Sequence, residues 1–342
     1  MSTKKYDYAI FIGRFQPLHN GHRKVIQTAL AIADKVIVVI GSADQPRTPK
    51  NPWTASERSA MIIAEELDHP NIRIVRVRDQ KYNDQKWTAS IQAAVAQATF
   101  TDSWRDKTTF CLIGHNKDES SYYLKMFPQW ELVDHEMDEL VSSTDLRALY
   151  FEGKNLKFLK ALVPAHVYKT LESFRNTEEF NVLVREYVTI EDYKKSWEVA
   201  PYAPTFVTTD AVVVQSGHIL LVLRGATPGE GQWALPGGFL NQAETMEDGM
   251  IRELREETKL KVPAPVLKGS IKASKVFDYP SRSLRGRTIT NAFLIELPSG
   301  ELPKVKGGDD AKRAKWFPIA EVKPEEMFED HFDIISYFLG RV

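Results

Sequence analysis

Short apolar runs alternate with amphipathic stretches along the first half of the chain. Four runs have the length of a buried strand: 7–12, 35–40, 72–77 and 109–113. The stretches between and after them carry apolar residues at helical spacing: 21–33, 55–67, 87–98 and 144–151. Strands that alternate with helices are typical of a parallel sheet covered by helices. This half is therefore predicted to be an α/β domain.

The alternation ends at a polar run from Arg175 to Glu179, directly after a helix predicted over 165–174. A connecting helix is predicted over 178–198, and Pro201 and Pro204 then favour an extended hinge before the next strand. We therefore divide the chain into a first domain, a connecting helix with its linker, and a second domain, at 1–180, 181–204 and 205–342.

The second domain has a different order of elements. Its predicted strands lie at 206–215, 218–223, 265–275 and 288–297. A loop rich in glycine and proline at 226–238 precedes a strongly charged helix at 245–259, and an apolar helix at 328–339 closes the domain. This order predicts a mixed α/β unit.

Composition excludes several classes of protein. The chain has 342 residues, more than one ordinary domain of about 100–200, and 43% of them are hydrophobic, which excludes wholesale disorder. The 45 Lys and Arg nearly balance the 46 Asp and Glu, so neither nucleic acid nor a membrane surface is expected as the main partner.

No apolar run approaches the ~20 residues that span a bilayer, and the N-terminal apolar stretch is too short for a secretion signal. With a single Cys111 in an apolar run, we expect a cytoplasmic protein without internal disulfides.

A candidate phosphate site follows the first predicted strand. Gly13 lies at the turn, where a glycine lets the backbone approach a ligand, and the free N–H groups that open the next helix favour an anion. His19 and His22 are three residues apart, so in a first helical turn both rings point to one side and can hydrogen-bond phosphate oxygens. These residues predict a site for nucleotide phosphates.

This segment resembles the (His/Thr)-x-Gly-His signature of the nucleotidyltransferase superfamily. The second signature of that superfamily, Ser-x-Thr-x-x-Arg, is matched late in the domain by Ser142, Thr144 and Arg147. Without the first signature, these three residues would indicate only an ordinary helix cap and a solvated arginine. The resemblance implies a Rossmann-like nucleotidyltransferase domain with a parallel sheet.

In detail the first domain resembles nicotinamide-mononucleotide adenylyltransferases of the archaeal type, through the segments 13–17, 51–58 and 82–87. The resemblance implies that the ATP phosphates are held by Arg14, His19, His22 and Arg147. It also implies that substrates contact Gly13, Phe15, Trp53, Trp87, Ser142 and Thr144.

Two points in this assignment stay open. Trp87 is expected on the nicotinamide ring, because a cationic ring prefers a tryptophan face, but Trp53 and Trp87 taken alone indicate core positions. The family usually has arginine directly before its Asp/Asn-Pro pair. Here Lys50 stands in that place with Arg47 nearby, so both are candidates for a phosphate contact.

The second domain carries a carboxylate-rich helix. Glu253 lies three residues before Glu256 and four before Glu257, so the three carboxylates are expected to converge on one helix face. Mg²⁺ and Mn²⁺ prefer oxygen ligands, which these carboxylates supply. Arg252 can fix the orientation of one carboxylate by hydrogen bonding to it without contacting the ion. By itself, however, a helix rich in Glu and Arg is more often a solvated, ion-paired face.

The spacing resembles the Nudix box, Gly-x5-Glu-x7-Arg-Glu-U-x-Glu-Glu-x-Gly-U with U aliphatic. The matches are Gly238, Glu244, Arg252, Glu253, Leu254, Glu256, Glu257 and Leu260. The six non-aliphatic matches would arise by chance about once in 10⁷ windows. Lys259 replaces the last glycine, which puts the usual left-handed end of the helix in question.

The Nudix resemblance implies an α/β/α sandwich with a mixed sheet and a metal-dependent hydrolase. Its catalytic metal ligands would be Glu253, Glu256 and Glu257, and its structural residues Gly238, Glu244 and Arg252. The substrate would be a nucleoside diphosphate linked to another group, held by Arg224, Phe277, Arg282 and Arg285. This pattern is similar to Nudix members that act on ADP-ribose. Glu329, Asp330 and His331 could add a base, but an exposed helix start is the stronger expectation.

The order of the two modules resembles bacterial bifunctional enzymes of NAD metabolism. The first half would transfer the adenylyl group of ATP to nicotinamide mononucleotide, giving NAD and pyrophosphate, by positioning and electrostatic stabilisation. The second half would cleave ADP-ribose to AMP and ribose 5-phosphate. Mg²⁺ or Mn²⁺ is expected in both domains, and ATP as a substrate. The expected partners are these nucleotides, with assembly into a homo-oligomer left open.

Two alternatives are compatible with the sequence. The adenylyl acceptor could be another phosphate, such as pantetheine phosphate or FMN, although Trp87 and the segment 51–53 favour nicotinamide. The Nudix half could be a non-catalytic sensor of ADP-ribose or NAD. Binding-only relatives should have lost the metal carboxylates, however, and Glu253, Glu256 and Glu257 are all present here.

Overall fold

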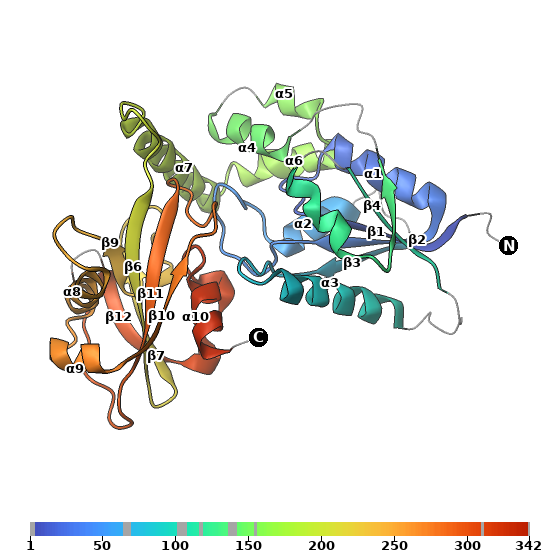
Figure 1. Cartoon of the computed structure of the whole chain (residues 1–342). Helices are drawn as coiled ribbons and strands as arrows, with labels where there is room; N and C mark the ends of the chain where they lie inside the picture. The colour runs from blue at the N-terminus through green and yellow to red at the C-terminus, as the bar shows by residue number, and fades with distance from the viewer. Residues whose placement is uncertain are drawn as a thin grey trace. The chain divides into compact units, whose positions relative to one another are not determined.

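The computed structural model describes residues 4–63, 70–100, 108–115, 119–135, 142–153, 156–308 and 311–340. The chain divides into two compact units, residues 1–184 and 185–342. Helix α7 (Glu178–Ser196) begins in the first unit and ends in the second (Figure 1). Within the described ranges, every helix is too short or too polar to cross a membrane.

The first unit is built on a parallel five-stranded sheet, in the order β3-β2-β1-β4-β5 (Figure 1). Its strands are β1 (Tyr6–Gly13), β2 (Ala33–Ile40), β3 (Ile72–Arg76), β4 (Phe110–Gly114) and β5 (Glu131–Asp134). The four predicted strands are confirmed. β5 was not predicted because it has only four residues and most of them are exposed.

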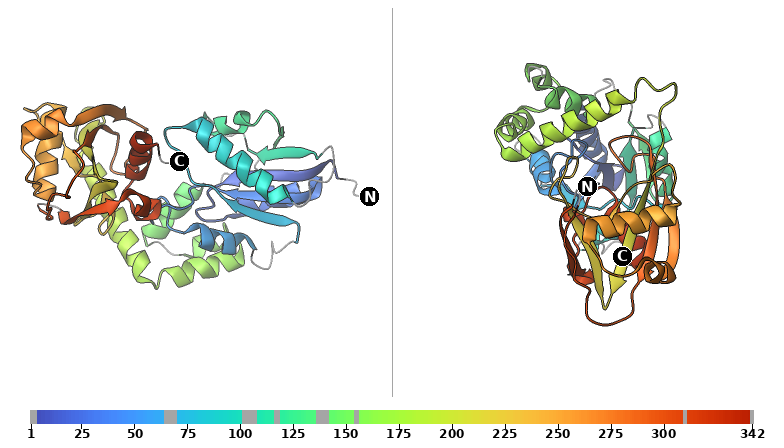
Figure 2. Two further views of the ribbon diagram at one scale, coloured as in Figure 1. Left: turned by 90° about the horizontal axis from the view of Figure 1, so that it is seen from below. Right: turned by 90° about the vertical axis from the view of Figure 1, so that its left-hand side faces the viewer.

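Helices α1 (Asn20–Ile32) and α3 (Asp84–Thr99) lie on opposite faces of this sheet (Figure 1), and the view from below shows α3 lying across the strands (Figure 2). Ile91 and Val95 of α3 pack on Ile10 and Leu112 of the sheet. The remaining helices are α2 (Ala55–Ile63), the 3-10 helix η2 (Glu119–Met126), α4 (Ser143–Phe151), α5 (Lys157–Lys160) and α6 (Ala165–Phe174). The end of the helix predicted over 55–67 lies outside the described residues.

The second unit has a mixed sheet in the order β10-β11-β6-β7-β12, with β8 paired to β7 and β9 to β6. Its strands are β6 (Phe206–Gln215), β7 (His218–Arg224), β8 (Trp233–Ala234), β9 (Gly237–Phe239), β10 (Ile271–Phe277), β11 (Thr288–Glu296) and β12 (Ala311–Pro318). β11 and β6 are parallel and the other pairs are antiparallel. Helices α8 (Met246–Thr258) and α10 (His331–Leu339) lie on opposite sides of the strands (Figure 1). The predicted fold class is therefore confirmed for both units.

Two sequence predictions in this unit need correction. The prediction of a strand over 265–275 is wrong for its first residues, because they belong to helix α9 (Ala264–Gly269), which precedes β10. Pro263 stands at the cap of α9, where the fixed φ of proline suits a helix start, and the short apolar run after it fits either structure. Strand β12 was missed because Lys312, Arg313 and Lys315 interrupt its apolar pattern.

Local signals begin and end α8. The Oγ1 of Thr245 accepts a hydrogen bond from the backbone N of Asp248 at 3.2 Å, which caps the first turn. At the other end Lys259 adopts the left-handed conformation, with φ 51° and ψ 27°, and its N–H donates to the carbonyl of Arg255. The helix thus keeps the left-handed end that a glycine would favour, at a cost of about 1–2 kcal/mol for a lysine.

Lys259→Gly should increase the free energy of unfolding of the second unit by about 1 kcal/mol, because glycine adopts this conformation without the steric penalty. Denaturant unfolding followed by tryptophan fluorescence measures the change. The control is Lys259→Ala, which removes the side chain but keeps the penalty, and should be no more stable than wild type. A Gly variant that is less stable than the Ala variant would contradict this account.

Candidate active sites

The first candidate site lies in the turn between β1 and α1. Phe15 has a positive φ of 53° and is 1% exposed, and its ring lies so close to Gly13 that a Cβ there would come within 2.8 Å. Gly13 is therefore required by the Phe15 ring, a reason that the sequence did not reveal. The Phe15 ring packs inside the turn and gives the turn its shape.

His19 and His22 cap each other at the start of α1. The Nδ1 of His19 accepts a hydrogen bond from the backbone N of His22 at 3.4 Å, and the Nδ1 of His22 accepts one from the backbone N of His19 at 3.3 Å. The two rings stack with their centroids 3.6 Å apart. Both imidazoles are thus oriented by backbone N–H groups rather than by acidic side chains.

This cap also decides which nitrogen of each ring carries a hydrogen. Burial lowers the pKa of His19 to about 4. Burial, together with the neighbouring His19 and Arg14, lowers the pKa of His22 well below its usual range. Both imidazoles are therefore neutral near pH 7, and since each Nδ1 is an acceptor, each Nε2 carries the hydrogen. The pair offers two N–H donors without the repulsion of two adjacent positive charges.

The second signature, on α4, is bonded to the same turn. Ser142 caps α4 by accepting a hydrogen bond from the backbone N of Thr144 at 3.2 Å. The buried Arg147 donates from Nη1 to the carbonyl of Gln16 at 2.8 Å and from Nη2 to Oγ1 of Thr144 at 3.2 Å. Burial and nearby Arg14 lower the pKa of Arg147 to about 10. The structure therefore brings the two signatures together.

Lys50 belongs to the same group of cations. Burial, Arg14 and Lys81 lower the pKa of Lys50 to about 8, and Arg147 also lowers it, while Asp79 raises it. Because Arg14 acts on Lys50 and Arg147 alike, these three cations form one positive cluster, and Arg14 acts on the neutral His22 beside them. Like charges held this close and partly out of water favour the binding of a polyanion.

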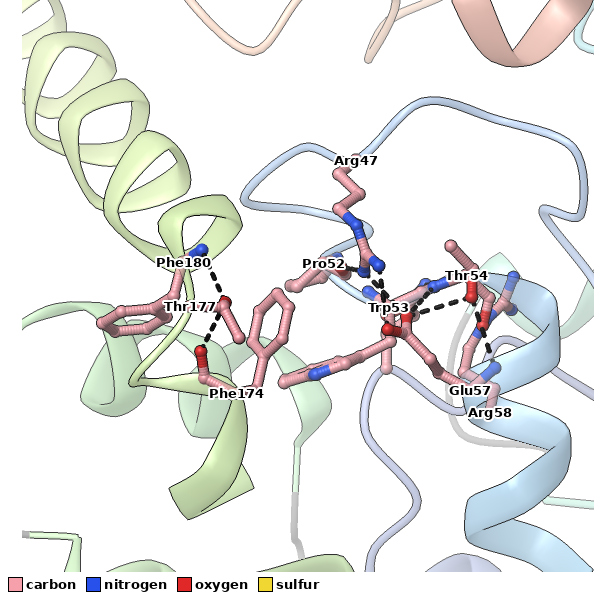
Figure 3. A network of polar contacts seen from close by, with 10 residues as sticks. Arg47, Pro52, Trp53, Thr54, Glu57, Arg58, Phe174, Thr177 and Phe180 are labelled. Atoms are coloured by element: carbon pink, nitrogen blue, oxygen red, sulfur yellow. Dashed lines mark hydrogen bonds and ion pairs between the residues drawn. The ribbon is translucent and has the colours of Figure 1, made fainter. Parts of the chain in front are cut away.

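Arg47, the other candidate cation, belongs to a different network (Figure 3). Its Nη1 and Nη2 donate to the carboxylate of Glu57 at 2.7 and 2.8 Å, and Nη1 also donates to the carbonyl of Pro52 at 2.6 Å. The guanidinium lies 5.2 Å from the centroid of the Phe174 ring. These contacts stabilise the loop before α2, so Lys50 is the better placed of the two for a phosphate.

The two tryptophans of the predicted site differ in burial. Trp53 is 2% exposed and packs on Tyr150 and Phe174, with ring centroids 5.6 and 6.0 Å away. Its ring belongs to the core, which corrects the expectation of a substrate contact. Trp87 is only partly buried and meets Tyr123 edge to face, with centroids 6.0 Å apart. Of the two rings, Trp87 is the one with accessible surface.

Sequence reasoning missed Arg58, which connects the ends of β1 and β2. This residue is 1% exposed, and its guanidinium donates to the carbonyls of Arg14 at 2.7 Å, Gly41 at 2.7 Å and Ser42 at 2.9 Å. The only available signal was its position on α2, three residues after the buried Ala55 and four before the buried Ile62. Arg58 thereby fixes the backbone from which Arg14 projects.

The second candidate site is built around Arg252 of α8. Its Nε and Nη2 donate to Glu244 at 3.0 and 2.8 Å, and its Nη1 donates to Glu253 at 2.8 Å and to Glu256 at 3.0 Å. Gly238 leaves room for the carboxylate of Glu253, because a Cβ there would come within 2.6 Å of it. The orientation of Glu253 is therefore fixed from both sides.

Glu253 and Glu257 line one pocket, with a volume of about 340 Å³. Glu256 is not part of its lining, and 44% of its side chain is exposed, but Nη1 of Arg252 bonds both Glu256 and Glu253, so these two carboxylates lie close together. That all three glutamates hold a metal ion stays a prediction. Burial raises the pKa of Glu257 to about 8, although its carboxylate accepts a hydrogen bond from the backbone N of Gly237 at 3.0 Å. Burial also raises the pKa of Glu253.

This pocket has the donor chemistry of a divalent-cation site. In the part of the chain that the structure describes, no group of three or more His, Cys, Asp or Glu side chains is arranged to hold a metal ion. Mg²⁺, however, commonly uses one or two carboxylates together with substrate phosphates and water. The raised pKa of Glu257 means that burial disfavours its negative charge, which a cation would stabilise. The residues thus fit an ion that binds with its phosphate substrate.

A buried ion pair in the pocket wall changes two predictions: that Arg282 is available to hold the substrate, and that residues 329–331 form an exposed helix start. Arg282 lines the pocket, but its Nε and Nη2 donate to Asp330 at 3.0 and 2.8 Å, and the two side chains are 2% and 0% exposed. Nδ1 of His331 accepts a hydrogen bond from the backbone N of Leu235 at 2.9 Å. Asp330 and His331 are buried, so the predicted exposed helix start is wrong, because Asp330 is bonded to Arg282 and His331 to the backbone N of Leu235 inside the wall.

The aromatic ring that the sequence predicted for substrate binding, Phe277, is not the one that lines the pocket. Phe277 is fully buried against Tyr337 and Phe338 of α10, so it is part of the core and does not line the pocket. Phe239 does line the pocket and is 41% exposed, and the guanidinium of Arg285 lies 5.3 Å from its ring centroid. Phe239 and Arg285 together form a flat, cationic edge of the pocket.

Two family models match the chain, one to each unit. A cytidylyltransferase-like model matches residues 10–149, and a NUDIX domain model matches residues 204–338. The chain is similar to the nicotinamide/nicotinic acid mononucleotide adenylyltransferase of Acinetobacter baylyi, with 40% identity over 54% of this chain and 94% of that protein. It is also similar to the ADP-ribose pyrophosphatase of Methanocaldococcus jannaschii, with 36% identity over 40% of this chain and 75% of that protein.

A solved structure matches the whole chain. It is a bifunctional NMN adenylyltransferase/ADP ribose pyrophosphatase from Francisella tularensis, complexed with AMP and a manganese ion. The sequences are 35% identical, the TM-score is 0.90, and the match covers 98% of this chain and 99% of that one. Both modules therefore occur in the same order in that protein.

His19→Asn should flatten the acid dependence of the stability of the first unit. Because burial lowers the pKa of His19 to about 4, the unfolded chain binds a proton between pH 6.5 and 4 that the folded chain does not. The free energy of unfolding therefore falls as pH falls, by up to about 1.4 kcal/mol per pH unit for this group. Asparagine keeps a capping acceptor but does not titrate. Thermal unfolding at stepped pH measures both slopes, and equal slopes would refute the assignment.

Proposed function

The chain belongs to the family of bifunctional NMN adenylyltransferase/ADP-ribose pyrophosphatases, and from this premise we propose a function for each unit. The first unit transfers the adenylyl group of ATP to nicotinamide mononucleotide, which gives NAD and pyrophosphate. The second unit hydrolyses ADP-ribose to AMP and ribose 5-phosphate. The observation that carries the proposal is that one chain holds both a cluster of cations beside two neutral imidazoles and a pocket lined by two partly buried glutamates.

In the first unit, Arg14, Lys50 and Arg147 hold the triphosphate of ATP, and His19 and His22 donate hydrogen bonds from Nε2. The phosphate oxygen of the mononucleotide attacks the α-phosphorus in line, and the bond to the departing pyrophosphate breaks. Charge that develops on the pyrophosphate meets donors that are already in place, so little reorganisation is needed. We assign the nicotinamide ring to Trp87, whose accessible face suits a cationic ring.

In the second unit, Glu253 and Glu257 hold Mg²⁺ or Mn²⁺ together with the pyrophosphate of ADP-ribose. The ion supplies charge neutralisation and a more acidic water. Arg252 keeps Glu253 in its orientation and also bonds Glu256, and Glu256 is proposed as a third carboxylate for the ion. Mg²⁺ is also proposed as the ion that accompanies ATP in the first unit.

The adenine of ADP-ribose is assigned to Phe239 and Arg285. Phe239 is the accessible aromatic ring in the pocket lining, whereas Phe277 is in the core and Phe328 is 4% exposed. A purine can stack on the Phe239 ring while the Arg285 guanidinium covers its edge or reaches the pyrophosphate. Arg224, which also lines the pocket, is assigned to a phosphate of the pyrophosphate.

His22→Ala should lower adenylyl transfer by about 10²–10³-fold, because one preorganised donor to the departing charge is lost, and should leave hydrolysis unchanged. Glu257→Gln should lower hydrolysis by about 10²-fold or more and leave adenylyl transfer unchanged. Pyrophosphate release from ATP with the mononucleotide, and AMP formation from ADP-ribose, measure the two reactions on the full chain.

The matched controls lie on the same helices. Gln27→Ala on α1 changes an exposed side chain, and Glu247→Gln on α8 changes a partly exposed one that pairs with Lys268, so neither should affect either reaction. If either active-site variant silenced both reactions in a folded protein, the sites would not be independent. If wild-type protein released pyrophosphate with pantetheine phosphate or FMN but not with nicotinamide mononucleotide, the assigned acceptor would be wrong.

Lys50→Ala should lower kcat for adenylyl transfer by about 10²-fold, whereas Arg47→Ala should mainly lower the thermal stability of the first unit. The reason is that Lys50 lies in the positive cluster, while Arg47 is bonded to Glu57 and Pro52. Lys50→Arg should restore part of the rate, because it restores the charge. Steady-state kinetics together with thermal unfolding separate the two roles, and the reverse pattern would exchange the assignments.

A further inference from the structure

Helix α7 carries a carboxylate within its buried stripe. Phe180, Leu183 and Ile190 are buried at helical spacing, and Glu186 lies between them, three residues after Leu183 and four before Ile190. Only 6% of Glu186 is exposed. A carboxylate in such a place is destabilising unless a specific partner satisfies it, so its partner indicates what it is for.

The partner of Glu186 is a backbone amide of the loop between β7 and β8. The backbone N of Gly229 donates to Oε1 of Glu186 at 2.7 Å, in a buried hydrogen bond within the second unit. Gly229 has a φ of 78°, and a Cβ at this position would come within 2.3 Å of the Phe328 ring. The loop therefore passes closely between α7 and Phe328, and no side chain fits at its point of contact.

The same loop positions Arg224, the last residue of β7. The Nε of Arg224 donates to the carbonyl of Pro228 at 3.0 Å, directly before Gly229. Its backbone N donates to the carbonyl of Gln232, and the backbone N of Gly231 donates to the carbonyl of Arg224, both at 3.0 Å. The guanidinium lies 3.9 Å from the centroid of the Phe328 ring. A shift of the loop would therefore move the guanidinium.

Arg224 faces the proposed hydrolytic site. It lines the same pocket as Glu253 and Glu257, and its positive charge lowers the pKa of Glu257 against the effect of burial. The charge of Arg224 also lowers the pKa of Glu186, which burial and Glu329 raise, to a net value of about 7. Arg224 thus lies within electrostatic range of both carboxylates.

We propose that Glu186 is a positioning residue for pyrophosphate hydrolysis: it holds Gly229, and through the loop 225–232 it holds the guanidinium of Arg224 at the pocket that contains Glu253 and Glu257. The inference rests on the proposed hydrolytic function of this pocket. It gives α7, which the sequence indicated only as a connector, a part in the second active site.

The test compares Glu186→Ala, Glu186→Gln, Arg224→Ala and the double variant Glu186→Ala/Arg224→Ala in the full chain. Glu186→Ala should lower kcat/KM for ADP-ribose by about 10-fold, in the range of lost outer-sphere contacts, while adenylyl transfer stays at the wild-type rate. Glu186→Gln should stay close to wild type, because its amide oxygen also accepts from Gly229. In the Arg224→Ala background, Glu186→Ala should cause little further loss, because its effect passes through Arg224.

Amide hydrogen exchange gives a readout that does not depend on the substrate. Exchange at Gly229 and in the loop 225–232 should become faster in Glu186→Ala and remain slow in Glu186→Gln. The control is Glu179→Ala, an exposed glutamate on the same helix, which should change neither exchange nor rate.

Three results would overturn the proposal: wild-type hydrolysis in Glu186→Ala, an equal loss in Glu186→Ala and Glu186→Gln, or the full loss from Glu186→Ala persisting in the Arg224→Ala background. A wild-type protein that does not hydrolyse ADP-ribose would instead refute the proposed function, and the exchange experiment would still test the contact between Glu186 and the loop. If Glu186→Ala failed to fold, Glu186→Met, which fills a similar volume but accepts no strong hydrogen bond from Gly229, would replace it in the kinetic and exchange measurements.

Discussion

Like charges held close together and partly out of water are the constraint on which both sites depend. In the first unit Arg14, Lys50 and Arg147 share one small region, and their proximity and burial lower the pKa of Lys50 to about 8 and that of Arg147 to about 10. In the second unit the signs are reversed, and burial raises the pKa of Glu257 to about 8. A bound polyanion relieves the first arrangement and a bound cation the second. Desolvating like charges lowers the stability of the folded protein, and a ligand of opposite charge binds more tightly because it removes that unfavourable free energy.

Such clusters persist only if the backbone around them is rigid. Arg58 bonds three carbonyls at the ends of β1 and β2, and His19 and His22 fix each other through backbone amides rather than through ionic partners. In the second unit a buried ion pair, Arg282 with Asp330, fills the wall behind the pocket. In both units, buried guanidinium groups therefore act as supports for the residues that meet the ligand.

The histidine pair shows how two adjacent imidazoles can both be hydrogen-bond donors without carrying charge. Two imidazolium ions with centroids 3.6 Å apart would repel each other, and burial would disfavour both. As neutral rings they keep one N–H donor each, oriented by the cap and ready for an oxygen that gains negative charge. The local structure of the first turn of α1 is thus itself part of the chemistry that we propose for the first unit.

The sequence determined the fold class, most of the elements and the chemical type of both sites, because these follow from periodicity and from residues close together in the chain. His19 with His22, and Arg252 with Glu256, are local patterns that α-helical geometry brings together. The sequence did not determine which matching residues face a ligand. Trp53 and Phe277 have the right chemistry but lie in the core, Arg47 is bonded to Glu57, and Glu256 is bonded to Arg252 outside the lining of the pocket. Burial and partner choice depend on contacts between segments far apart in sequence, such as Arg282 with Asp330 or Glu186 with Gly229. Only the tertiary structure decides such contacts, because the residue type is the same whether its side chain is exposed or is buried and hydrogen-bonded.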